Sequence, residues 1–177
     1  MAHLAPISLK KTTTTAIYNH NLAKPASTVR LDSFRSHIVC LQPDGSSCPL
    51  FITAAVDEST GEVVYQSVDS NLMKSQEVVL FLNQTKKHLE QSGKALETVV
   101  VDLIPTYQNQ GFIGSCTHSG IAVQFTPLMA LNRAERYFQS LDMFLHSHTR
   151  VKTLDLEEAS DFAHTYADQI YNSRRVV

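Results

Sequence analysis

The run from Leu50 to Val56 constrains the fold more than any other part of the sequence. It is apolar at nearly every position, and only Thr53 interrupts it. A short run without alternation is typical of a central strand that is buried on both faces of its sheet. The rest of the chain must therefore supply neighbouring strands and a covering layer on each face.

Strand patterns occur on both sides of this run. Residues 29–41 alternate imperfectly and are rich in β-branched side chains, and the turn sequence 43–47 follows them. A second turn sequence, 57–61, separates the central run from another apolar stretch at 62–68. Turn residues between apolar runs indicate hairpin connections, so three strands in succession are predicted.

The remainder of the chain mixes helices with strands. Apolar residues at helical spacing, followed by Gly93, predict an amphipathic helix at 75–91. A buried fourth strand at 97–104 is expected to be parallel, because a helical crossover separates it from the third. Four later segments follow: an irregular stretch that has room for a short helix and ends in an entry turn, then a fifth strand and two helices. They cover 106–119, 120–125, 129–146 and 155–172. This order is α/β.

Length and composition favour one soluble domain. The chain has 177 residues, 43% of them hydrophobic, and no stretch approaches the roughly 20 apolar residues of a membrane-spanning helix. Residues 1–27 show no apolar period and are predicted to form a flexible N-terminal arm, followed by a core domain at 28–177. No signal-peptide pattern is recognisable, so a cytoplasmic location is expected.

Cysteine, histidine and charge patterns exclude several classes of protein. Cys40, Cys48 and Cys116 are odd in number and lack CxxC spacing, which argues against a disulfide framework or a zinc ribbon. The pair His146 and His148 has no ligand partners at suitable spacing. The net charge of −2 argues against a stand-alone nucleic-acid binder, since such domains are usually basic.

Three acidic residues on three predicted elements are candidates for a metal site. Asp32 lies in the first strand, Asp102 ends the fourth, and Glu135 lies in the helix after the fifth. In open α/β sheets the functional crevice forms at strand ends. Clustered carboxylates there suit two hard cations, Mg²⁺ or Mn²⁺, and phosphoryl transfer. Acids are common, however, and spacing alone leaves a solvent-exposed role open.

Several sequence blocks resemble, in order, the catalytic core of DDE transposases and retroviral integrases, nearest to the branch that contains the phage Mu transposase. The second and longest block, which covers two strands and the turn between them, is the most specific. The blocks span 29–32, 49–64, 98–102, 120–127, 132–141 and 170–174. The resemblance covers nearly the whole chain outside the arm.

This resemblance implies a ribonuclease-H-like fold with a mixed five-stranded sheet flanked by helices. It implies Mg²⁺-dependent DNA nicking and strand transfer, in transposition or integration, with Asp32, Asp102 and Glu135 as catalytic residues and metal ligands. The expected partners are DNA, namely transposon ends and target, and further copies of the chain. The terminal DNA-binding domains of the family are not found here, so end binding should need other subunits or domains.

Two features keep other functions open. After Asp102 the family usually has a polar, flexible pair, whereas this chain has the apolar segment 103–105. A decayed or repurposed core, acting as a regulatory or assembly module, would leave the three acids solvated or paired with Arg133 or Arg136. A small nuclease of the same fold is a third possibility. If the segment after Asp102 is an active-site loop, Tyr107 and Gln110 are expected to line the DNA path.

Overall fold

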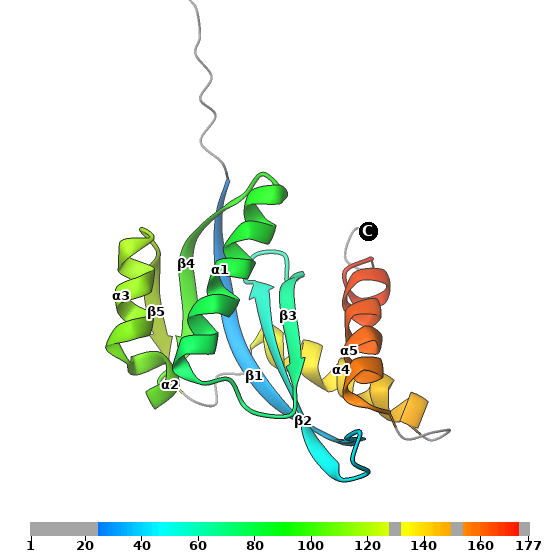
Figure 1. The fold of residues 1–177 in the computed structure, drawn as a ribbon. Coiled ribbons are helices and arrows are strands. Elements are labelled where there is room, and N and C mark those ends of the chain that lie inside the picture. Colours follow the sequence, from blue (N-terminus) through cyan, green and yellow to red (C-terminus); the bar gives the residue numbers. More distant parts are fainter. Residues whose placement is uncertain (1–24, 128–131, 150–153, 174–177) are drawn as a thin grey trace, which may run out of the picture.

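The computed structural model describes residues 25–127, 132–149 and 154–173. In this part of the chain five strands form one mixed sheet in the order β3-β2-β1-β4-β5 (Figure 1). The strands are β1 (Ala26–Leu41), β2 (Ser47–Asp57), β3 (Val63–Asp69), β4 (Ala95–Asp102) and β5 (Ala122–Thr126). The helices are α1 (Ser75–Gln91), α2 (Pro105–Gln108), α3 (Gln110–His118), α4 (Arg133–Thr149), α5 (Leu156–Thr165) and the π-helix η1 (Tyr166–Tyr171).

The first three strands form the antiparallel half of the sheet, and β4 and β5 add a parallel half. β1 pairs antiparallel with β2, and β2 with β3, as the predicted turns require. α1 then carries the chain across the sheet, and β4 pairs parallel with β1 on its other side. The predicted parallel fourth strand is therefore confirmed. β5 extends the sheet, parallel to β4.

Helices cover both faces of the sheet, as predicted from the run in β2 that is apolar on both sides of the strand. Leu50, Ile52 and Val56 of β2 belong to one core cluster, together with residues of α4 and α5. Ala55 points to the opposite face and belongs to a second cluster with residues of α1 and α3. Because successive strand residues alternate between faces, this single strand contributes to both layers of the core.

Sequence reasoning placed α1 correctly. The helix spans the predicted residues, and its buried side chains recur at helical spacing. It ends where Gly93 takes a φ of 75°, a left-handed conformation that glycine adopts without a steric penalty.

The stretch 106–119, expected to be irregular with room for one short helix, is almost entirely helical. Pro105 occupies the first turn of α2, where its missing N–H costs nothing. Asn109 then caps α3, because its side-chain oxygen accepts the N–H of Phe112 at 2.9 Å. Phe112 and Cys116 are the buried positions of this short helix. Two apolar positions one turn apart give too weak a period for detection from the sequence.

Several boundaries differ from the predictions by a few residues, three of them near the arm or the acidic residues. β1 begins at Ala26, so the last two residues of the predicted arm belong to the sheet, while residues 1–24 of the arm lie outside the described residues. β4 ends at Asp102 instead of continuing to residue 104. Asn132 is not helical and α4 begins at Arg133, although residues 129–131 of the predicted helix also lie outside the described residues.

Cys40, Cys48 and Cys116 are free, buried thiols. No helix of the described residues is long and apolar enough to cross a membrane.

Candidate active site

The fold brings the three predicted acids to one side of the sheet. β1 and β4 are parallel neighbours whose last aligned pair is Arg30 and Val100. Asp32 and Asp102 each lie two residues beyond this pair, and a step of two residues returns a strand side chain to the same face. Glu135 approaches from α4, in the first turn of that helix. Three separate elements thus supply one acid each.

Asp32, Asp102 and Glu135 all border one cavity of about 210 Å³. Its other lining residues are Ser33, Phe34, Asn132 and Phe138. Within the described ranges no group of three His, Cys, Asp or Glu side chains lies close enough to hold a metal ion. The structure therefore places the three carboxyl groups around a shared space without closing them into a cluster.

Asp32 is the most perturbed of the three acids. Oδ1 accepts the N–H of Ser33 at 2.8 Å, and Oδ2 accepts the amide of Asn132 at 3.4 Å. Burial nevertheless raises the pKa of Asp32 above its ordinary value, and the nearby Asp102 carboxylate adds to this rise. A desolvated carboxylate beside a second one is stabilised by a cation.

Asn132 connects Asp32 to the helix that carries Glu135. Its Oδ1 accepts the N–H of Glu135 at 2.8 Å and so caps the start of α4. Its Nδ2 is the group that donates to Asp32. One amide side chain therefore contacts both β1 and the start of α4, and Asp142 makes further α4 contacts with Ser36 and His37 of β1.

Arg30 is a site residue that sequence reasoning missed. It is 6% exposed, and its Nε lies 2.7 Å from Oε1 of Glu58. Its Nη1 lies 3.5 Å from Oδ1 of Asp102 and donates to Thr126 Oγ1 at 3.1 Å. The sequence contains one signal, because Arg30 is two residues from Asp32 in a strand and must share its face. The partners of Arg30 depend on strand order and could not be read from the sequence.

The two arginines proposed to neutralise the acids have other positions. Arg133 Nη1 donates to the backbone carbonyl of Ser59 at 3.0 Å, and Arg136 is exposed. In the described part of the chain no ion pair joins either residue to Asp32, Asp102 or Glu135. Pairing of the acids with Arg133 or Arg136, one of the two arrangements expected for a repurposed core, is therefore not found in the described residues, and solvated acids, the other arrangement, stay a prediction.

Tyr107 does not line a path for DNA. The side chain is buried, with 3% exposed, and its ring packs against the ring of Phe112. Burial raises the pKa of Tyr107 to about 12, while a hydrogen bond with Ser33 acts in the opposite direction. Tyr107 therefore supports the strand that carries Asp32. Gln110 is exposed, and its proposed role at a DNA path stays a prediction.

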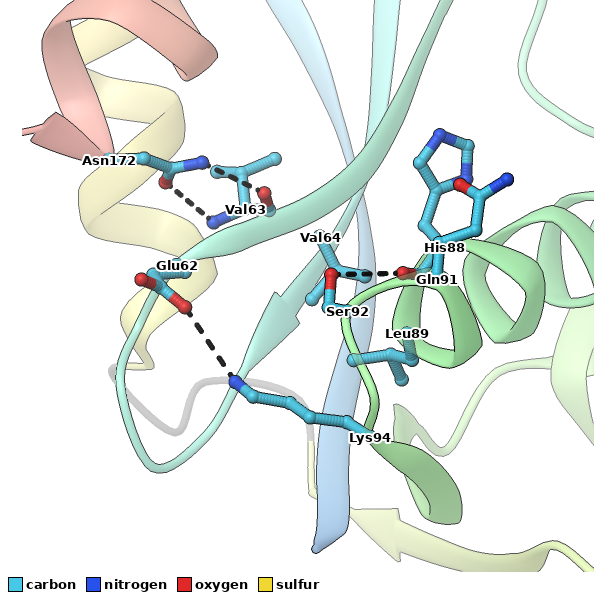
Figure 2. Close-up of a pocket in the computed structure, with 9 residues that line it drawn as sticks. All are labelled: Glu62, Val63, Val64, His88, Leu89, Gln91, Ser92, Lys94 and Asn172. Atoms are coloured by element: carbon cyan, nitrogen blue, oxygen red, sulfur yellow. Dashed lines mark hydrogen bonds and ion pairs between the residues drawn. The ribbon is translucent and has the colours of Figure 1, made fainter. Parts of the chain in front are cut away.

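A larger cavity, of about 420 Å³, lies on the far edge of the sheet, between β3, the end of α1 and Asn172 (Figure 2). Asn172 and Lys94 of its lining contact other parts of the protein. Asn172 accepts the N–H of Val63 at 2.9 Å and donates to the Val63 carbonyl at 3.0 Å, like a neighbouring strand. Lys94 Nζ lies 3.8 Å from Glu62. These contacts anchor the C-terminal segment to the sheet and suggest no chemistry.

The acid cavity fits a divalent metal ion in its chemistry. Its acidic groups are carboxylates, which hard cations such as Mg²⁺ and Mn²⁺ prefer. Burial, and after it the nearby Asp102 carboxylate, raise the pKa of Asp32, and a bound cation would offset both effects. The three carboxyl groups border the space from three elements, so a cation bound there would contact protein on several sides.

A scan against models of protein families and a search of curated protein sequences find no match to this chain. Solved structures match in fold. A chain of the simian T-cell lymphotropic virus intasome, solved with the PP2A regulatory subunit B56 gamma, gives a TM-score of 0.61 at 18% identity over 82% of this chain. The match covers 49% of that chain, so the present chain spans about half its length.

Isolated cores match over nearly their full length. The HTLV-2 integrase catalytic core domain, in a dimeric form with magnesium, gives a TM-score of 0.59 at 19% identity, over 84% of this chain and 90% of that one. The BIV integrase catalytic core domain gives 0.57 at 18% identity, over 81% and 84%. The chain therefore has the ribonuclease-H-like fold of integrase catalytic cores, and the predicted fold class is confirmed.

Proposed function

We propose that this chain is the catalytic core of a transposase or integrase, and that it carries out metal-dependent DNA nicking and strand transfer. The observation that supports this most directly is the cavity beside β1 and β4, which Asp32, Asp102 and Glu135 border from three elements. The fold alone hosts many activities, so the argument depends on these residues. Their order along the chain is the one that the DDE resemblance requires.

The proposed roles follow from the position of each residue. Asp32 and Asp102 lie side by side on a rigid sheet and would form the fixed part of a cation site. Glu135 lies on α4, whose start is held by Asn132, and would complete the site from the other side. When bound, a pair of Mg²⁺ or Mn²⁺ ions activates the attacking oxygen and stabilises the leaving oxygen of the phosphodiester.

The proposed partners are DNA and further copies of this chain. A chain with a net charge of −2 is poorly suited to bind DNA phosphates by itself. The recognition of transposon ends is therefore assigned to other domains or subunits. The matching HTLV-2 cores are described as dimeric and trimeric, and another match comes from an intasome. These likenesses motivate a homo-oligomer on DNA.

The test is nicking of a supercoiled plasmid in Mn²⁺. Asp102→Asn and Glu135→Gln should each lower the rate by more than the roughly 10- to 100-fold typical of residues that only support metal ligands. Asp161→Asn and Glu157→Gln change exposed acids of α5 in the same way and should nick at the wild-type rate. Retention of nicking in both site variants would contradict the proposal. Absence of nicking and of Mn²⁺ binding in the wild type would favour the repurposed-core alternative.

A further inference from the structure

Arg30 is a buried cation in direct contact with one of the proposed metal ligands. Guanidinium groups carry a permanent positive charge in proteins. A charge with a side-chain exposure of 7% is stable only when anions and hydrogen-bond acceptors surround it. Arg30 therefore depends on the acids around it, and they in turn experience its positive charge.

The contacts of Arg30 are unequal. The bond from Nε to Glu58 is short, at 2.7 Å, whereas Nη1 lies 3.5 Å from Asp102. Thr126 Oγ1 bridges Arg30 and Asp102. It accepts a hydrogen bond from Arg30 Nη1 at 3.1 Å and lies 3.2 Å from Asp102 Oδ1. The network thus connects β1, β4, β5 and the turn after β2.

All of these contacts on Asp102 involve the same oxygen. Arg30 and Thr126 both approach Oδ1. Among the described residues, no hydrogen bond is recorded for Oδ2. An arginine that holds one carboxylate oxygen orients the group and leaves the other oxygen available to the cavity, which Asp102 borders.

We propose that Arg30 is a fixed positive charge which positions Asp102 through Oδ1 and weakens the binding of divalent cations in the acid cavity. This inference depends on the proposed function, because it concerns the same carboxylates. Arg30 compensates part of the negative charge of Glu58 and Asp102 that would attract a cation. It also repels a doubly charged ion a few ångströms away, at a distance where water screens incompletely.

The test is calorimetric titration of Mn²⁺ into the purified, metal-free protein and four variants. Arg30→Met removes the charge and keeps a long side chain, and it should bind Mn²⁺ at least about tenfold more tightly than the wild type. Arg30→Gln removes the charge but keeps a donor for Glu58, and should act in the same direction if the Met variant does not fold. Arg30→Lys keeps the charge and should stay near the wild-type affinity.

Arg35→Met is the matched control. Arg35 belongs to the same strand, is exposed, and does not line the acid cavity. Its removal changes the net charge equally and should leave Mn²⁺ affinity unchanged. If Arg35→Met tightens binding as much as Arg30→Met does, the effect is one of net charge and the inference is wrong.

The remaining outcomes separate the inference from the proposed function. Unchanged or weaker binding in Arg30→Met and Arg30→Gln, with measurable wild-type binding, overturns the inference and leaves the metal site standing. Mn²⁺ binding in Arg30→Met and Arg30→Gln, with none in the wild type, supports the inference that Arg30 weakens the site. No binding in any of the proteins, when urea unfolding shows that they are folded, contradicts the metal site itself, and the inference fails with it.

Discussion

The side-chain amide of Asn132 donates to Asp32 Oδ2 across 3.4 Å, while the oxygen of the same amide accepts the N–H of Glu135 at 2.8 Å. The first contact connects α4 to the sheet, and the second starts the helix. Asn132 thus links Glu135 to Asp32, while Asp142 holds α4 against β1 farther along through Ser36 and His37. Asn132 is accordingly a positioning residue for the proposed site.

Replacement of Asn132 should separate capping from positioning. Asn132→Ser retains a capping hydroxyl but is too short to reach Asp32, whereas Asn132→Ala loses both functions. We expect the Ala variant to lose about 1 kcal/mol of unfolding free energy and the Ser variant much less. Both should nick DNA roughly 10- to 100-fold more slowly. Urea unfolding and the plasmid assay measure the two effects, and a Ser variant that nicks at the wild-type rate would rule out the positioning role.

Asp32→Asn should stabilise the protein when divalent cations are absent. Burial and the neighbouring Asp102 raise the pKa of Asp32, so the folded state holds its proton more tightly than the unfolded state does. The stabilisation that protonated Asp32 contributes is complete below its ordinary pKa of 3.8, and it is lost as the pH rises through the raised pKa. At pH 7 in EDTA the neutral Asn variant should therefore melt at a higher temperature than the wild type, and the gap should narrow towards pH 4. A lower melting temperature at pH 7 would contradict this account of the site.

Asp57 should show the opposite pH dependence. It is 1% exposed, and burial alone would raise its pKa. Hydrogen bonds from Ser59 and the N–H of Thr60, with Lys94 Nζ at 3.4 Å, instead hold the pKa of Asp57 below its ordinary 3.8. Its contribution is therefore present above 3.8 and is lost as the pH falls through the lowered pKa.

The substitution Asp57→Asn tests this dependence. The variant should lose roughly 3 kcal/mol of unfolding free energy at pH 7, because it weakens several charge-assisted hydrogen bonds. The loss should shrink when urea unfolding is repeated near pH 3. Asp161→Asn, at an exposed position of α5, should show no comparable loss at either pH. An equal loss at both pH values would mean that shape, and not charge, explains the effect.

Tyr137 and Gln66 form a buried polar pair between α4 and β3. Tyr137 OH donates to Gln66 Oε1, and among the described residues Nε2 of Gln66 has no hydrogen-bond partner. Tyr137→Phe should cost about 1–3 kcal/mol, since it leaves the amide oxygen unpaired as well. A double variant with Tyr137→Phe and Gln66→Leu lacks both unpaired groups and should regain most of the lost unfolding free energy. A double variant less stable than Tyr137→Phe would contradict this prediction.

The parts of the fold that were predictable from the sequence are those with a strong local signal. The apolar run in β2 required two covering layers, and the helical period before Gly93 defined α1. The sequence indicated at most one short helix in 106–119, because α2 and α3 bury few residues, Tyr107 in one and Phe112 and Cys116 in the other. Their formation depends on the cap at Asn109 and on packing against α1, which no local period reveals.

The site was predictable only in part, for a related reason. One acid could be placed within a strand, one at a strand end and one in a helix, and the structure puts all of them on one cavity. The side chains that position them, Arg30 and Asn132, contact partners 72 and 100 residues away along the chain. Contacts of this kind follow from strand order and helix placement, so they become visible only in the folded structure.

The most direct test of the account is a crystal structure of the protein grown in Mn²⁺, with anomalous scattering used to locate the metal. We predict a peak between Asp32 and Asp102, with carboxylate oxygens at the 2.0–2.6 Å typical of hard divalent cations and with Glu135 turned towards it. The peak should be absent from the Asp102→Asn variant. Mn²⁺ bound elsewhere, or no peak in wild-type crystals at saturating Mn²⁺, would contradict the claim that these three residues form a metal site.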